Sequence, residues 1–140
     1  MTVDEAKKEL RQIKDMEKDI RSVELEIERL MTVATKMTPG YDVVGSSGWH
    51  KDKIAEALIK IEEYRGRLAN LVIESIDLKS RCLDKVNRIS PKTLRTVLIY
   101  YYFMDHTLEK TAELMEKSYQ WTYTIYTTAL EKYCEISDAT

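Results

Sequence analysis

Histidine and cysteine, the side chains that most often carry metal or nucleophile chemistry, are scarce in this sequence. There are two histidines, His50 and His106, and two cysteines, Cys82 and Cys134. Neither histidine has a Cys or a carboxylate at metal-ligand spacing, and the cysteines form no CxxC pair. A Gly-rich phosphate loop, an HExxH motif and a GxSxG motif are also missing from the sequence. We therefore expect a protein that is not an enzyme, with no catalytic residue, metal or cofactor.

The charged residues indicate a solvated surface rather than a reaction centre. The 24 Asp and Glu nearly balance the 22 Lys and Arg, and nearly all carboxylates fall on helical faces beside a basic residue. The net charge of −2 creates no global positive field that would indicate nucleic acid. The longest apolar run, Val97 to Met104, has 8 residues, far below the roughly 20 that cross a bilayer. We therefore expect no membrane association and, with two cysteines, a reducing cytoplasm.

One uncharged polar segment has side chains suited to reading another molecule. No Lys or Arg occurs between Ser118 and Glu131, where Tyr, Thr and Gln predominate. Gln can pair bidentately with adenine, and Thr and Tyr hydroxyls can reach bases or phosphates. Such residues are also used by protein interfaces. The predicted contacts to double-stranded DNA are Ser118, Tyr119, Gln120, Thr122, Tyr123 and Thr127.

The elements that must position these side chains have the dimensions of a helix-turn-helix. A short helix from Leu108 to Met115 is followed by a turn at Glu116-Lys117, then by a helix that Ser118 caps and that runs to about Tyr133. The predicted inward-facing residues of the pair are Leu108, Ala112, Met115, Trp121, Ile125, Ala129 and Leu130.

A third helix completes the predicted C-terminal module, residues 90–134. Ser90 is the expected N-cap and Pro91 the first helical residue, and the chain breaks again at Asp105-His106-Thr107. The expected buried face of this helix comprises Leu94, Val97, Leu98 and Tyr101. Residues 135–140 are expected to form a tail.

The C-terminal module resembles region 4 of sigma-70-type factors. The segments that carry the resemblance are Val97-Leu98 through Tyr102, Thr107-Leu-Glu-Lys-Thr-Ala-Glu-Leu-Met115, Ser118-Tyr-Gln-Trp121 and Ala129-Leu-Glu-Lys-Tyr133. With its Gly/Ser-rich stretch Val44-Gly-Ser-Ser-Gly48, the chain is similar to small phage and prophage proteins of Gram-positive bacteria, uncharacterised or described as phage transcriptional regulators. The resemblance implies promoter-DNA binding and contact with host RNA polymerase in the cytoplasm of a bacterial host cell. The family pattern commonly has Gly where Glu116 stands and an apolar residue where Thr111 stands.

The charge of the module leaves other functions open. From Pro91 to Tyr133 there are five basic and five acidic residues, so the module should bind DNA weakly by itself. A dimer or RNA polymerase would have to supply affinity. The alternative is a coiled-coil assembly or adaptor protein whose helix-turn-helix binds protein or is vestigial. A small DNA-packaging protein is a third hypothesis.

The first 89 residues are predicted to form a long antiparallel helical hairpin, a coiled coil. From Ala6 to Met37 the apolar residues keep a 3-4 spacing over four heptads, and a second run extends from about His50 to Arg88. The loop between them, about residues 38–50, holds three of the four glycines. Trp49 and His50 are expected to cap or staple the second helix. The fold class is therefore all-α, a hairpin followed by a three-helix module.

Flanking charges and an extra apolar stripe predict the register and the assembly. An antiparallel pairing places Glu26 opposite Lys60 and Asp19 opposite Arg67. The extra stripe on the second helix should be buried by the C-terminal helices, by a second protomer or by both, and we expect a homodimer. The stripe consists of Leu58, Val72, Ile76, Leu83 and Val86.

Overall fold

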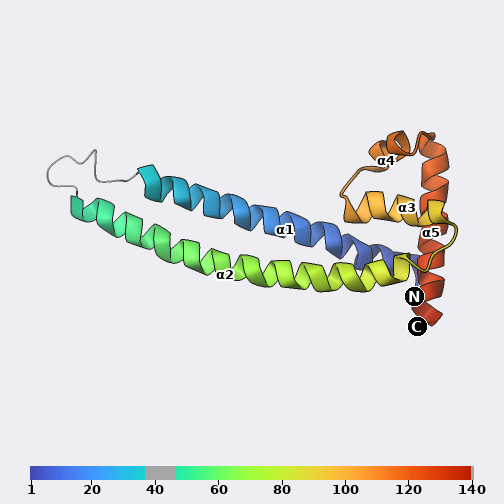
Figure 1. The fold of residues 1–140 in the computed structure, drawn as a ribbon, viewed down its shortest axis with the longest axis horizontal. Helices are drawn as coiled ribbons and strands as arrows, with labels where there is room; N and C mark the ends of the chain where they lie inside the picture. The colour runs from blue at the N-terminus through green and yellow to red at the C-terminus, as the bar shows by residue number, and fades with distance from the viewer. Residues whose placement is uncertain (37–46, 140) are drawn as a thin grey trace. The chain divides into compact units, whose positions relative to one another are not determined.

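The 3-4 spacing of apolar residues produces an all-α fold, a long antiparallel α1·α2 hairpin followed by packed C-terminal helices, as the sequence predicts (Figure 1). The computed structural model describes residues 1–36 and 47–139, with backbone alone for residues 47–50. Most of the predicted loop at 38–50 lies outside the described residues. The side chains of Trp49 and His50, predicted to cap or staple the second helix, are not among the described side chains. The elements are α1 (Val3–Lys36), α2 (Ser47–Val86), α3 (Lys92–Leu98), the π-helical segment η2 (Ile99–Phe103), α4 (Leu108–Leu114) and α5 (Tyr119–Ala139).

The chain divides into two compact units, and the longer helices contribute to both. One unit comprises residues 1–16 and 75–140, and the other comprises residues 17–74. This division differs from the one predicted from the sequence, which separates a hairpin of 89 residues from the C-terminal module. The first turns of α1 and the last turns of α2 share a core with the C-terminal helices. We call residues 17–74 the hairpin unit and the remainder the C-terminal unit.

The hairpin unit is held by the apolar seam between α1 and α2. Val23, Ile27 and Leu30 of α1 and Ala57 and Ile61 of α2 are buried along this seam. The register agrees with the predicted one. The Arg29 guanidinium, bonded to Glu26 at 2.6 Å, and then Lys60 hold the pKa of Glu26 below its usual value. Asp19 and Arg67 line one hollow between the helices.

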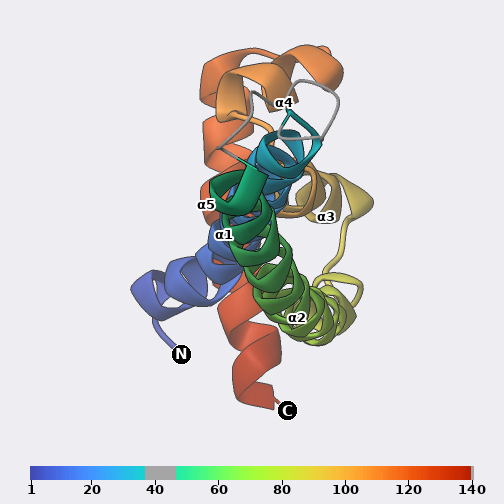
Figure 2. The same ribbon diagram turned by 90° about the vertical axis from the view of Figure 1, so that its left-hand side faces the viewer.

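The C-terminal unit has one continuous hydrophobic core. Leu10 and Ile13 of α1, together with Cys82 and Val86 of α2, pack on the C-terminal helices. The residues that α3, η2 and α5 contribute to this core are Leu94, Val97, Leu98, Tyr102, Tyr126, Ala129, Leu130, Tyr133 and Cys134. α4 lies against the N-terminal half of α5 (Figures 1 and 2), and α3 also packs on α5. The core therefore fixes the helix on which the candidate DNA contacts lie.

Two local predictions are wrong. Ser90 is not the N-cap of the third helix, because α3 begins at Lys92 and Pro91 occupies the cap position with extended backbone and no side-chain cap bond. Residues 135–139 are not a tail, because α5 continues to Ala139. The extension is stabilised where Cys134 and Ile136 pack on the core that the start of α1 shares.

The extra apolar stripe of α2 is covered along only part of its length. Val86 is buried and Leu83 is half-buried in the C-terminal unit. Leu58, Val72 and Ile76 are 52%, 37% and 63% exposed in the single chain. The C-terminal helices thus cover one end of the stripe, and the remainder faces solvent. Within the described residues, no helix is both long enough and apolar enough to span a bilayer.

Candidate nucleic-acid interface

α4 is a short helix that begins at a well-formed cap. The hydroxyl oxygen of Thr107 accepts a hydrogen bond from the backbone N–H of Lys110 at 3.0 Å. Thr111 and Ala112 are buried, while Leu108 and Met115 pack, partly buried, against the core. The predicted inward positions Leu108, Ala112 and Met115 are therefore confirmed. Thr111 can replace an apolar residue because its hydroxyl donates to the Thr107 carbonyl at 2.8 Å.

A tight turn joins α4 to α5. Glu116 has a φ of 56°, the left-handed conformation that favours glycine, and the N–H of Lys117 donates to the Ala112 carbonyl at 3.0 Å. Ser118 then caps α5, because its Oγ accepts a bond from the Trp121 N–H at 3.1 Å. The predicted turn and cap are both present, so the two helices form a helix-turn-helix unit.

The buried face of α5 includes Ala129 and Leu130, as predicted, but its first turns differ from the prediction. Thr122 is fully buried and Tyr126 is 6% exposed, whereas Trp121 and Ile125 are only half-buried. Thr122 is therefore not an outward-facing DNA contact, and that prediction is wrong. Its hydroxyl donates to the Ser118 carbonyl at 2.9 Å, which lets this polar residue pack as a small apolar one.

The sequence contains a signal that identifies this face. Thr122, Tyr126, Ala129 and Tyr133 follow one another at spacings of four, three and four residues, the pattern of a buried helical stripe. Ranking residues by hydrophobicity favoured Trp121 and Ile125 and concealed the pattern. In the first turns of α5 the most buried residues therefore lie one position after the predicted ones, a rotation of about 100° about the helix axis, whereas Ala129 and Leu130 are buried as predicted.

Tyr126 is held by a second buried tyrosine. Its hydroxyl lies 2.7 Å from the hydroxyl of Tyr102 on η2, and the Tyr101 ring packs edge-on against both. Burial is the first cause that raises the pKa of both Tyr102 and Tyr126 above the usual tyrosine value. The two hydroxyls therefore form a buried hydrogen bond between η2 and α5.

The exposed face of the first turns of α5 carries the remaining candidates. Tyr119 and Tyr123 are 46% and 49% exposed, and their rings stack with centroids 6.4 Å apart and an interplanar angle of 21°. Gln120 is exposed between them in sequence, and Ser118 is exposed at the cap. The structure therefore brings Ser118, Tyr119, Gln120 and Tyr123 together at the N-terminal end of the second helix.

Thr127, also predicted as a contact, is half-buried farther along α5. Its hydroxyl donates to the Thr124 carbonyl at 2.8 Å, and the Thr128 hydroxyl donates to the same carbonyl at 3.0 Å. Thr124 is exposed, and its hydroxyl donates to the Gln120 carbonyl at 3.0 Å. The hydroxyl protons of these threonines are thus engaged by the helix itself, and their methyl groups are left for contact.

One cation near this face comes from a distant part of the sequence. Lys14 of α1 and Tyr119 line the same groove of about 290 Å³, together with Tyr101 and the start of α4. The Lys14 ammonium lies 3.5 Å from the Tyr101 ring centroid and 4.0 Å from an Asp105 carboxylate oxygen. Sequence reasoning missed Lys14, because only the fold places α1 beside the helix-turn-helix.

Lys110 and Lys117, the lysines of α4 and the following turn, both have partners. Lys110 forms an ion pair with Glu113 at 3.7 Å, and the Lys117 ammonium lies 5.4 Å from the Trp121 ring centroid. Like the sequence count, this arrangement gives no dense basic patch among the described residues of α4 and α5.

His106 and Cys82, two side chains that could be reactive, are packed against neighbouring residues. His106 is half-buried beside the Tyr100 ring, with centroids 6.0 Å apart. Cys82 is buried next to the Glu9–Lys85 ion pair, and burial raises the pKa of its thiol. No group of three His, Cys, Asp or Glu residues suited to a metal occurs within residues 1–36 and 51–139.

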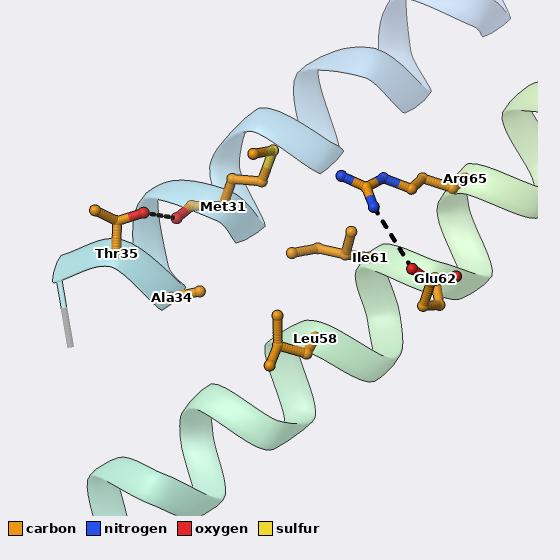
Figure 3. A pocket seen from close by; sticks show the side chains of 7 residues that line it. All are labelled: Met31, Ala34, Thr35, Leu58, Ile61, Glu62 and Arg65. Carbon is orange, nitrogen blue, oxygen red and sulfur yellow. Dashed lines mark hydrogen bonds and ion pairs between the residues drawn. The ribbon is translucent and has the colours of Figure 1, made fainter. Parts of the chain in front are cut away.

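A second concave surface lies on the hairpin unit. A groove of about 280 Å³ is formed there by α1 and α2, with apolar side chains at its centre and an ion pair of 3.5 Å between Arg65 and Glu62 at its edge (Figure 3). Its lining residues are Met31, Ala34, Thr35, Leu58, Ile61, Glu62 and Arg65. Its apolar centre suits contact with an apolar side chain.

Comparison with models of protein families, with curated proteins and with solved structures found no match to this chain.

Proposed function

We propose that this protein is a phage-type transcription regulator that binds promoter DNA through the α4–α5 helix-turn-helix. The observation that carries the proposal is the capped two-helix unit, with Tyr119, Gln120 and Tyr123 exposed together on the first turns of α5. Those turns are the part of a helix-turn-helix that enters the major groove. The buried Thr122 and Tyr126 fix the orientation of this surface.

The charge balance restricts how such a protein binds. Phosphate contacts usually dominate DNA affinity, and the module is electrically balanced, so specific binding requires support from a second copy or from host RNA polymerase. Lys14 lines the groove beside Tyr119, where it already contacts the Tyr101 ring and Asp105. An action on host promoters would take place in the bacterial cytoplasm.

The second copy is proposed to bind through the hairpin unit. On the outer face of α2, the exposed residues Ile59, Gly66 and Ile73 recur every seven residues, and the small exposed residue Ala69 lies three residues after Gly66. The small residues allow two helices to approach closely, and the flanking isoleucines would then be buried between them. A homodimer formed through α2 would present two helix-turn-helix units.

A second candidate function is a coiled-coil adaptor that binds another protein. This function is favoured by the exposed apolar side chains of the hairpin unit. Ile59 and Ile73 of α2, and Leu25 of α1, are each more than 60% exposed. In this case the Tyr-rich face of α5 would contact protein.

The proposed function is tested with purified full-length protein, purified polymerase of a Gram-positive host and the promoter region next to the corresponding gene. Footprinting should show protection that is lost when Gln120 and Tyr123 are both replaced by Ala. Helicity and thermal stability should remain, because both side chains are exposed. The control variant Glu131→Gln changes an exposed residue farther along α5 and should leave protection intact.

Retention of neither polymerase nor DNA would contradict the regulator. A double variant that stays folded and keeps full protection would place DNA contact elsewhere. Polymerase binding that is lost when Ile59 and Ile73 are replaced by Lys, without protection of DNA, would favour the adaptor function.

A further inference from the structure

The exposed surface of the first three turns of α5 limits which bases it can recognise. No residue from Tyr119 to Leu130 is charged. The commonest specific contact to guanine comes from Arg or Lys to O6 and N7, and the N4 amino group of cytosine is typically bound by a carboxylate. Neither type of side chain is present on this surface, so the usual partners of a G·C pair are missing from it.

The threonines of this surface offer methyl groups rather than hydroxyl donors. Thr124 and Thr127 each donate their hydroxyl proton to a carbonyl within α5, at 3.0 and 2.8 Å. A threonine methyl group is a standard contact for the C5-methyl group of thymine. The exposed rings of Tyr119 and Tyr123 add apolar area beside it, while tyrosine hydroxyls commonly contact phosphate oxygens.

Gln120 is the one amide on this surface. It is exposed on the first turn of α5, two residues after the Ser118 cap, and its side chain makes no hydrogen bond to any described part of the chain. An amide presents a donor and an acceptor side by side, which matches the N7 acceptor and the N6 donor of adenine.

We infer that the helix reads A·T base pairs in the major groove, with Gln120 bound to adenine and the Thr124 methyl group and the Tyr123 ring against thymine methyl groups. This inference rests on the proposed function, because it names the base pairs that the same interface selects.

The test is selection of binding sites by the full-length chain from a pool of random duplex DNA, followed by sequencing. The selected half-site should be rich in A·T. Gln120→Ala should abolish the preference at one adenine and lower affinity for the selected site about 5- to 150-fold. Gln120→Glu should change that same position from A·T to C·G, because a carboxylate accepts a bond from cytosine N4. Glu131→Gln is the matched control and should select the parental site.

The outcomes separate this inference from the proposed function. A half-site of G·C pairs, or an A·T half-site that Gln120→Ala and Gln120→Glu leave unchanged, would overturn the base assignment while DNA binding stands. Retention of no duplex at all would overturn both. Circular dichroism of each variant distinguishes loss of recognition from unfolding, and Glu near a helix N-terminus is favourable, so Gln120→Glu should remain helical.

Discussion

At the scale of single residues, buried hydroxyl groups decide which face of α5 is available. Thr122 and Tyr126 occupy the core because backbone and side-chain acceptors satisfy their hydroxyls. Gln120 and Tyr123 are exposed as a consequence. The exposure of Ser118, Tyr119, Gln120 and Tyr123 could be predicted from the sequence, whereas Thr122 is buried, because residue type alone does not reveal that a hydroxyl has a partner.

The helix phase can be tested with two lysine substitutions. Thr122→Lys places an unpaired charge in the core and should lower the free energy of unfolding by about 3 kcal/mol or more. Thr124→Lys introduces the same charge two residues later, at an exposed position, and should change it by about 0.5 kcal/mol or less. Chemical denaturation measures both values. Equal stabilities of the two variants would show that the phase is wrong.

The buried tyrosines predict a loss of stability in alkali. The folded chain holds the pKa of Tyr102 and Tyr126 above their usual value, whereas an unfolded chain ionises tyrosine near pH 10. A raised folded-state pKa leaves the contribution intact below about pH 10 and removes it as the pH rises further. As the pH rises, the loss of helical circular dichroism should coincide with the appearance of tyrosinate absorbance in the ultraviolet. The loss of helix with pH should be less steep in a Tyr102→Phe/Tyr126→Phe variant. Ionisation of all tyrosines in a chain that remains folded would contradict this.

At the scale of elements, periodicity predicted the helices well and their ends less well. The 3-4 spacing identified the hairpin, and Ser118 and the 105–107 break identified the C-terminal helices. The end of α5 could not be predicted, because Cys134 and Ile136 extend the helix by packing on the start of α1, more than a hundred residues away in sequence. The start of α3 also differs from the prediction, since local cap rules favour Ser90 and Pro91 occupies the cap position.

The turn between α4 and α5 carries a removable strain. Glu116 adopts a left-handed conformation, in which a Cβ is unfavourable. Glu116→Gly should therefore raise the free energy of unfolding by about 0.5–1 kcal/mol. Glu113→Gly, within α4, should lower it by about 0.5–1 kcal/mol, because glycine is unfavourable inside a helix. Thermal unfolding of both variants checks the contrast, and a destabilised Glu116→Gly variant would mean that the turn differs from the one described.

At the scale of the whole molecule, the exposed apolar side chains of α2 predict self-association. Replacing both Ile59 and Ile73 by Lys should give a monomer in sedimentation equilibrium, because the proposed contact would then bury unpaired charges. Glu74→Lys introduces a lysine on the same helix at an exposed position beside the heptad series, away from the proposed contact, and should leave the dimer intact. A parental chain that stays monomeric at high concentration would exclude the homodimer and leave α2 for another partner.

The helix-turn-helix is the central claim, and an NMR titration of the isotope-labelled full-length chain with promoter duplex tests it most directly. Backbone amide shifts should change first at Ser118, Tyr119, Gln120 and Tyr123, with smaller changes at the start of α4 and at Lys14. Absence of any change, or changes confined to the hairpin unit, would contradict DNA binding by this surface.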